Sequence, residues 1–301
     1  MHIKLENYSK KPENNNIPTT NNSIKNEYLI ESEVLKSIIS QKNIKILDLR
    51  KEELYNKEHI LGAIHISRGD IEDTTFPYKG MLPKPKQIEK LFSSLGIESE
   101  DMIIAYDDKG LCETARLWWV LQNYNFKNIK MLHGGIDSWK SINGLVSNQI
   151  IKITPSNFKL SKKENRQYYI SKEEVLKSLE KNTILIDTRT LNEYTGLQQK
   201  NGATKAGRIP KSIHIDWAEA INYNGNYHLK SIKELEDIYI NKLNLKKKDS
   251  IILYCHSGVR SAHTTFILTQ LLGFKNVKNY DGSWTEWSYF QTLPFINNNK
   301  K

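Results

Sequence analysis

The chain contains two similar segments in tandem, and this repeat restricts its possible folds more than any other feature. Residues 103–139 (IIAYDDKGLCETARLWWVLQNYNFKNIKMLHGGIDSW) match residues 251–287 (IILYCHSGVRSAHTTFILTQLLGFKNVKNYDGSWTEW) without a gap. Upstream, residues 44–67 and 183–216 each contain an apolar run that ends in Asp-x-Arg, then a polar loop, then Ile-His-Ile. The second copy has a longer loop because it carries the insertion GLQQKNGATKA. Self-similarity on this scale predicts two copies of one domain.

The domain boundaries follow from the repeat and from local composition. We expect a first domain over residues 27–150, a linker over residues 151–167 and a second domain over residues 168–297. Residues 1–26 are polar, rich in asparagine and poor in aromatic side chains. Such a segment buries too little apolar surface to offset the entropy lost on ordering, so we expect a disordered tail.

Short apolar runs alternate with helical stretches in the second copy. The predicted order is helix 171–179, strand 183–188, strand 212–216, helix 231–243, strand 251–255, helix 261–273 and strand 276–281. This alternation predicts an α/β fold, in which each domain is a mostly parallel sheet with helices on both faces. Ligands of such sheets bind at the carboxyl ends of the strands. Asp187 and Cys255, each at a strand end, are therefore expected at one edge of the sheet.

Composition argues against several classes of function. The chain is 38% hydrophobic and has no apolar run of the roughly 18 residues that a membrane span needs. Its two cysteines lack framework spacing, which indicates a reducing compartment, and we expect a cytoplasmic protein. The net charge of +10 comes mostly from scattered lysines. Without zinc-finger spacing or an aromatic RNA-binding signature, it favours a solvated basic surface over a nucleic-acid site, although it would also attract a small anionic substrate.

The segment YCHSGVRS, which begins at Tyr254, places a cysteine between a strand and a helix. A tight loop that opens into a helix points backbone N–H groups inward and binds anions, and Gly258 can adopt the positive φ that such a loop needs. Cys255 at the mouth of this loop should have a lowered pKa and act as a thiolate nucleophile. Arg260 adds a permanent charge and a planar fork of donors. A buried structural cysteine is the plainer alternative, but the loop context favours a reactive thiol.

The first copy serves as an internal control for this assignment. It carries Asp107 where the second copy carries Cys255, and Cys112 falls at the position of Arg260. A carboxylate in that place cannot attack as a thiolate. We therefore predict chemistry in the second copy only, and a structural role for Cys112.

These features resemble the tandem-domain rhodaneses, the thiosulfate and 3-mercaptopyruvate sulfurtransferases. The resemblance covers roughly residues 27–295 and rests on the doubled domain, the aspartate in the first copy, the cysteine loop and NVKNYDGSWTEW. It implies a rhodanese-like fold for both domains and a persulfide-forming Cys255. The resemblance assigns the remaining site residues as follows: substrate-binding His256, Ser257, Gly258, Val259 and Arg260, and supporting Asp187 and Arg189.

Some positions depart from the family pattern and bear on the sulfur donor. The animal thiosulfate enzymes carry a lysine where this chain has Ser257, and a substrate-binding arginine where it has Glu193. The mercaptopyruvate enzymes have a CG-(S/T)-GVT loop without a terminal arginine. The loop CHSGVRS is similar to arginine-ended loops of bacterial thiosulfate-type members, which favours thiosulfate and leaves 3-mercaptopyruvate as the alternative donor.

The resemblance implies a double-displacement reaction without a metal or organic cofactor. Sulfur passes from a small anionic donor to Cys255, and then to a thiol, to cyanide or to a protein acceptor. His256 in a loop and His263 on a helix make a poor metal site. Two rival functions stay open at this point. A cysteine phosphatase is disfavoured because its loop needs five residues between Cys and Arg and this chain has four, whereas a protein sulfur carrier is compatible with the loop.

Overall fold

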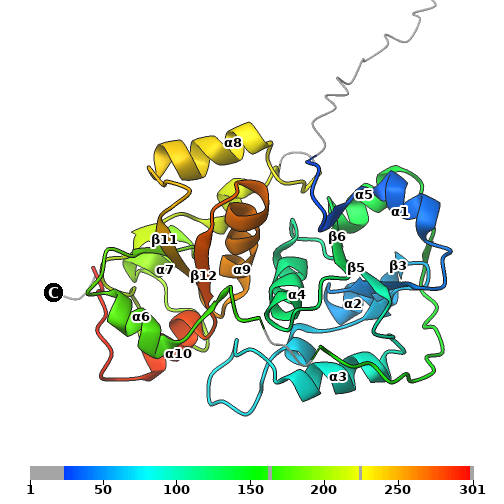
Figure 1. The fold of residues 1–301 in the computed structure, drawn as a ribbon, viewed down its shortest axis with the longest axis horizontal. Coiled ribbons are helices and arrows are strands. Elements are labelled where there is room, and N and C mark those ends of the chain that lie inside the picture. The colour runs from blue at the N-terminus through cyan, green and yellow to red at the C-terminus, as the bar shows by residue number, and fades with distance from the viewer. Residues whose placement is uncertain (1–23, 162–164, 224–225, 299–301) are drawn as a thin grey trace, which may run out of the picture.

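The computed structural model describes residues 24–161, 165–223 and 226–298, and it contains two domains side by side (Figure 1). Each domain has one five-stranded parallel sheet. The strands are β1 (Leu29–Ile30), β2 (Ile44–Asp48), β4 (Ile64–His65), β5 (Met102–Tyr106) and β6 (Ile129–Leu132) in the first, and β8 (Tyr169–Ile170), β9 (Ile184–Asp187), β10 (Ile213–His214), β11 (Ser250–Tyr254) and β12 (Asn276–Tyr280) in the second.

The two sheets have the same topology, as the repeat predicts. The first runs β1-β6-β5-β2-β4, and the second, listed from the equivalent strand, runs β8-β12-β11-β9-β10. A short antiparallel pair, β3 (His59–Ile60) with β7 (Val146–Ser147), forms a separate two-stranded sheet in the first domain. Every strand predicted for the second copy is confirmed, while β8 was not expected.

Helices cover both faces of each sheet. They are α1 (Ser32–Ile38), α2 (Glu52–Lys57), α3 (Pro85–Ser94), α4 (Cys112–Asn123) and α5 (Gly135–Ser141), then α6 (Lys172–Ser178), α7 (Leu191–Thr195), α8 (Ile232–Glu236), α9 (Val259–Phe266) and α10 (Ser283–Tyr289). Helices α8 and α9 continue as π-helical turns over Asp237–Lys242 and Ile267–Leu271, and 3-10 turns span Arg68–Ile71 and Trp217–Ala220.

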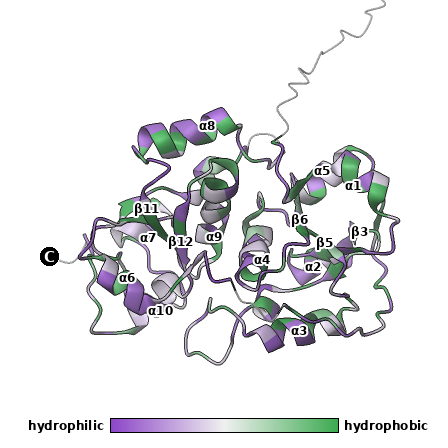
Figure 2. Ribbon diagram, viewed as in Figure 1, coloured by the Kyte–Doolittle hydropathy of each residue, from purple (hydrophilic) through white to green (hydrophobic). Residues whose placement is uncertain are grey.

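Strand β5 shows why both faces need a cover. Ile103 and Ala105 belong to one buried cluster, whereas Ile104 and Tyr106 belong to another on the opposite face. Successive side chains of a strand point to opposite faces, so a strand that is apolar throughout must be buried on both. Figure 2 accordingly shows green in strands such as β5 and β11 and mixed green and purple in outer helices such as α8. The predicted α/β class is confirmed.

The two domains share one apolar core. Helix α4 of the first domain packs against α9 of the second, and the ring of Trp118 meets that of Phe266 edge-on with centroids 5.1 Å apart. These are the helices that follow the two equivalent loops. The repeat therefore brings both loops to the seam between the domains.

The segments outside the domains are partly packed. The predicted tail lies outside the described residues except for residues 24–26, where Ile24 is buried and the Asn26 amide donates to the Gln270 carbonyl. In the predicted linker, Phe158 is fully buried against Phe92. Packed chain thus extends further into the tail than we expected, and the linker is anchored on the first domain. No helix among the described residues is both long and apolar enough to cross a membrane.

Candidate active site

The carboxyl ends of β9 and β11 bring Asp187 and Cys255 to the same edge of the second sheet. Asp187 ends β9 and lies in register with Tyr254, the last residue of β11. Cys255 follows directly and is 1% exposed. The parallel topology thus places both residues where the sequence predicted.

The loop after Cys255 is shaped around a glycine and a serine. Gly258 has φ +74°, and a Cβ added there would lie 2.5 Å from the Asp281 carbonyl oxygen, so a side chain fits neither the backbone conformation nor the space. The Ser283 hydroxyl accepts hydrogen bonds at 3.1 Å from the backbone N–H groups of both Cys255 and Gly258. Ser283 belongs to the YDGSW motif, which explains why that motif accompanies the cysteine loop.

The environment of Cys255 favours its thiolate. Burial is the strongest influence and raises the pKa of the thiol, but the charge of Arg260 opposes it. The Ser261 hydroxyl and the backbone N–H groups of Ser261 and Ser257 also lower the pKa of the thiol. The net result is a pKa below the ordinary value. Only the thiolate is nucleophilic, so the loop favours the chemically reactive form of Cys255.

The first domain shows the same loop filled by a carboxylate. Asp107 Oδ1 accepts hydrogen bonds at 3.0 Å from the N–H groups of Lys109 and Leu111, and Oδ2 accepts from those of Glu113 at 2.9 Å and Thr114 at 3.1 Å. Burial raises the pKa of this carboxyl and outweighs the hydrogen bonds from backbone N–H groups, which lower it. Four backbone donors therefore converge on a two-atom anion at the position equivalent to Cys255.

Cys112 has an environment opposite to that of Cys255. It is 5% exposed at the start of α4. Burial, and then the charge of Glu113, raise the pKa of its thiol well above the ordinary value. A thiol that stays protonated is a poor nucleophile.

The guanidinium of Arg260 is already paired within the protein, contrary to the simple expectation for a residue that binds an oxyanion. Its Nη1 and Nη2 donate to the two oxygens of Glu193 at 2.7 and 2.8 Å. Burial raises the pKa of Glu193, but the Arg260 hydrogen bonds and charge prevail and lower it to about 2. The pair therefore stabilises the fold above the ordinary glutamate pKa, and this contribution is lost as the pH falls towards about 2.

The pairing of Glu193 with Arg260 is the part of the site that sequence reasoning missed. The place of Glu193 is set by a capping box at the start of α7, in which the Thr190 hydroxyl accepts from the Glu193 N–H. The pattern Thr-x-x-Glu was a visible signal for that helix. Nothing local indicated its pairing with a residue 67 positions away.

Asp187 and Arg189 hold the surrounding loops. Arg189 Nε and Nη2 donate to both Asp187 oxygens, and Nη2 also donates to the Gly207 carbonyl at 2.8 Å. In the first domain, Arg50 bonds in the same way to Asp48 and to a loop carbonyl. The same contact is thus present in the first domain, which has Asp107 in place of Cys255, and this indicates a structural role.

The two histidines of the motif lie in separate environments. His256 Nε2 pairs with the Asn201 carbonyl oxygen at 2.9 Å, which holds the inserted loop over the site, while His263 Nε2 pairs with the Gly110 carbonyl oxygen in the other domain. Burial lowers the pKa of each to about 4. They share no ligand position.

The described residues contain one group with metal-ligand chemistry, at the domain seam. It comprises Glu31, His133 and His228. His133 Nδ1 pairs with Glu31, and its Nε2 accepts the Leu229 N–H at 3.0 Å. Both ring nitrogens are thus already used in hydrogen bonds, which disfavours a metal there.

Because the pKa of His256 is about 4, this side chain stays neutral across the neutral range. The pH profile of kcat/KM for the sulfur donor is therefore expected to show no ionisation belonging to His256 between pH 5 and 8. An inflection in that range in the wild-type profile that disappears in His256→Gln would show that this histidine titrates during turnover.

A strap from the first domain, residues 73–82, covers the cysteine loop. A Cβ on Gly80 would lie 2.7 Å from the Ser257 carbonyl oxygen, so the two backbones touch. The Thr285 hydroxyl donates to the Lys79 carbonyl at 2.8 Å, and the Tyr78 hydroxyl donates to Glu286 at 3.1 Å. One wall of the site around Cys255 thus belongs to the first domain.

A buried ion pair fixes the first domain beneath this loop. Arg116 on α4 is fully buried and donates from Nη1 to Asp281 at 2.8 Å and from Nη2 to the Gly80 carbonyl at 2.9 Å. The Asp281 carboxylate also accepts the Leu82 N–H. The same guanidinium therefore ties together the strap and the YDGSW segment.

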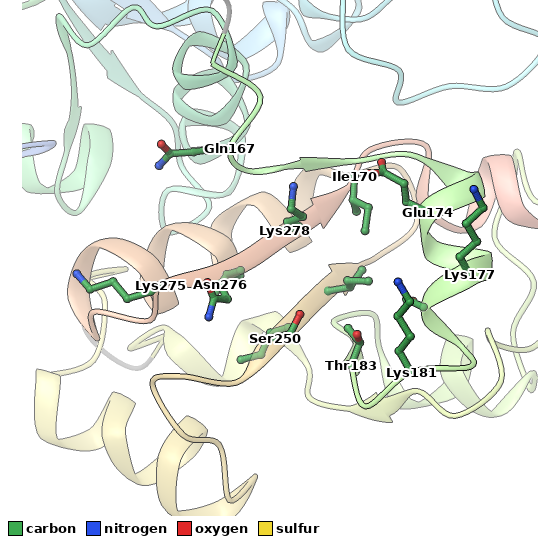
Figure 3. A pocket seen from close by; sticks show the side chains of 14 residues that line it. Gln167, Ile170, Glu174, Lys177, Lys181, Thr183, Ser250, Lys275, Asn276 and Lys278 are labelled. Carbon is green, nitrogen blue, oxygen red and sulfur yellow. The ribbon is translucent and has the colours of Figure 1, made fainter.

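A hollow of about 490 Å³ lies at the opposite edge of the second sheet, where β11 and β12 begin (Figure 3). Its cations are Lys177, Lys181, Lys275 and Lys278. Lys275 lies at the far end of the hollow from Lys177 and Lys181 in Figure 3, so the cations do not converge. The convergent chemistry lies at the Cys255 edge.

Comparison with known proteins agrees with this geometry. The chain is 29% identical over 279 residues to thiosulfate sulfurtransferase of Corynebacterium glutamicum, covering 89% of this chain and 90% of that protein. It is 29% identical to the sulfur carrier protein TtuD of Thermus thermophilus, covering 89% and 96%. The crystal structure of SseA from Escherichia coli, described as a 3-mercaptopyruvate sulfotransferase, superimposes with a TM-score of 0.75 at 25% identity, covering 85% and 98%.

The family assignment follows from the matched residues. The rhodanese-like domain matches the chain twice, over residues 31–142 and 171–289. These ranges contain four of the five strands of each sheet and both equivalent loops. The chain therefore belongs to the rhodanese family, with two rhodanese-like domains of which the second carries Cys255.

Proposed function

We propose that this protein is a sulfurtransferase that moves the outer sulfur of thiosulfate to a thiophilic acceptor through a persulfide on Cys255. The observation that carries the proposal is the pair of equivalent loops. In one loop, four backbone N–H groups hold the two-oxygen anion of Asp107. In the other, the equivalent loop surrounds a thiol whose pKa is lowered, and the two sulfur atoms of a persulfide are the matching anion.

The two half-reactions balance without any further oxidant or reductant. The Cys255 thiolate attacks the outer sulfur of thiosulfate, a sulfur–sulfur bond forms, and the bond to the sulfonate sulfur breaks to release sulfite. An acceptor thiolate or cyanide then attacks the terminal sulfur of the persulfide, and Cys255 leaves as a thiolate. Loop N–H groups stabilise the negative charge at each stage.

Glu193 marks a departure from the animal thiosulfate enzymes at the position of their substrate-binding arginine. The resemblance to the animal enzymes places a substrate-binding arginine at this position, whereas here a carboxylate occupies the fork of Arg260. Thiosulfate and 3-mercaptopyruvate are both anions and would both have to compete with Glu193 for that guanidinium, so the preference for thiosulfate rests on the arginine-ended loop CHSGVRS. We expect kcat/KM with cyanide as acceptor to be higher for thiosulfate, and a reversed order would make the protein a mercaptopyruvate enzyme.

The relative from Thermus thermophilus supports a second candidate, a protein sulfur carrier, because that protein is described as a sulfur carrier. Slow discharge of the persulfide by small acceptors combined with rapid discharge by a protein would favour the carrier. A cytoplasmic location stays a prediction from cysteine usage.

Arg260 is expected to act on Cys255 through its charge. In Arg260→Ala, the pKa of Cys255 should rise, and persulfide formation from thiosulfate should slow by roughly 10- to 150-fold, the range of a charged hydrogen bond. Arg260→Lys should recover part of this loss, because it keeps the charge without the planar fork. The pH dependence of Cys255 alkylation measures the pKa, and rapid mixing measures the two half-reactions separately.

Glu193→Gln serves as the matched variant, since it removes the negative charge beside Arg260 and should lower the pKa of Cys255 further. A structural role for Arg260 predicts a different pattern. In that case Arg260→Ala would slow persulfide formation and its discharge by cyanide equally, and would lower the melting temperature.

A further inference from the structure

A small pocket next to the cysteine loop is formed entirely by the first domain. It has a volume of about 370 Å³ and lies under the strap and the 3-10 turn before it. Its lining includes Arg68, Glu72, Asp73, Tyr78 and Lys79. None of these residues was singled out by sequence analysis, and the proposed reaction has not used the pocket.

Glu72 stands out among the lining residues. It is 7% exposed, and its Oε1 accepts no hydrogen bond from the described residues. A buried carboxylate normally has a partner, because leaving it without one is costly. Because Glu72 lines the pocket, a molecule bound there could supply the donor that this oxygen lacks.

Two of the other charged groups in the pocket, Arg68 and Asp73, are already paired. Arg68 donates from Nε and Nη2 to Glu113 at 2.5 to 3.1 Å, although its charge also reaches Glu72. Asp73 accepts from Thr75 and lies 3.6 Å from the Lys84 ammonium. This pairing leaves the carboxylate of Glu72 and the exposed ammonium of Lys79 to meet a ligand.

The pocket adjoins the reacting cysteine through two contacts. Arg68 Nη1 lies 3.5 Å from the Ser257 hydroxyl, and the backbone of Gly80, next to Lys79, touches that of Ser257. Ser257 is two residues beyond Cys255. A molecule in the pocket is therefore close to the loop that carries the persulfide.

From this arrangement we infer that the pocket is the acceptor subsite and that it selects a thiol bearing a protonated amine, with Glu72 as the partner of that amine. Lys79 is suited to an accompanying carboxylate, so an amino-acid-type thiol matches both charges. The inference rests on the proposed sulfurtransferase function. In the step concerned, the acceptor thiolate forms a bond to the terminal sulfur of the persulfide, the bond to Cys255 breaks, and the products are an acceptor persulfide and the Cys255 thiolate.

The test uses the full-length protein loaded with thiosulfate, with the persulfide first verified by intact mass. Its discharge is then timed with four thiols: cysteamine, cysteine, 3-mercaptopropionate and 2-mercaptoethanol. Rate constants are expressed per thiolate. In Glu72→Gln, the ratio of the cysteamine constant to the 2-mercaptoethanol constant is expected to fall by roughly 10- to 150-fold, the range of a charged hydrogen bond.

Two further variants guard against a merely structural effect. Lys79→Gln, an exposed change, should lower the cysteine constant relative to cysteamine. Glu52→Gln, an exposed glutamate on α2 outside the pocket, should leave every ratio as in the wild type. Loaded Glu72→Gln protein whose constants for all four thiols fell equally, or did not change, would overturn the acceptor subsite alone. Absence of the loaded species in the wild type would overturn the proposed function, and this inference with it.

Discussion

Replacing Cys255 by serine is expected to abolish sulfur transfer, with a loss of about ten-thousandfold or more, as for other covalent nucleophiles. A serine hydroxyl at this position stays protonated at neutral pH and cannot form the persulfide. The fold should be retained, because the replacement is nearly isosteric and the loop is held by Gly258 and Ser283. Steady-state assays with thiosulfate and cyanide measure the loss, and circular dichroism checks the fold.

Cys112→Ser is the matched control. Cys112 is also buried next to an equivalent loop, but burial raises the pKa of its thiol, and its position corresponds to Arg260 rather than to the nucleophile. Its activity should stay close to that of the wild type. If the Cys112 variant were inactive and the Cys255 variant active, the equivalence of Asp107 and Cys255 would be wrong.

Arg116→Ala is expected to have the second-largest effect, although Arg116 lies in the first domain and Cys255 lies in the second. Removing one partner of a buried ion pair costs about 3–5 kcal/mol, because the other charge is left uncompensated. Here that charge is Asp281, whose backbone carbonyl lies against Gly258 of the cysteine loop. We expect a lower unfolding free energy in denaturant titration together with a lower kcat/KM for thiosulfate.

Lys242→Ala is the control for this prediction. Lys242 pairs with Glu219 at 2.6 Å on the exposed surface of the second domain, where such pairs contribute about 1 kcal/mol or less. An Arg116 variant as stable and active as the Lys242 variant would remove the supporting role of the first domain. So would full activity of a soluble chain shortened to residues 160–301.

The sequence was sufficient for those parts of the site that depend on local pattern and sheet topology. Asp187 and Cys255 meet at one edge because both end parallel strands, and Gly258 has the positive φ that its loop requires. The repeat also predicted the shared topology of the sheets. These inferences involve neighbours in sequence or rules that hold for any parallel sheet.

The sequence was insufficient for contacts between distant segments. Arg260 has the residue type of an anion binder, yet its fork is filled by Glu193. Arg116 sits in an ordinary helical pattern, and only the packing of α4 on α9 brings it to Asp281, 165 positions away. The strap is similar, since a loop in one domain gives no local sign of the surface that it will cover in the other.

The central claim is that Cys255 accepts a single sulfur atom from thiosulfate. Intact-mass measurement tests it directly, on wild-type protein incubated with thiosulfate and freed of excess donor. We expect a gain equal to one sulfur atom in the wild type and in Cys112→Ser, none in Cys255→Ser, and its removal by cyanide. No gain in the wild type, or the same gain in Cys255→Ser, would contradict the account.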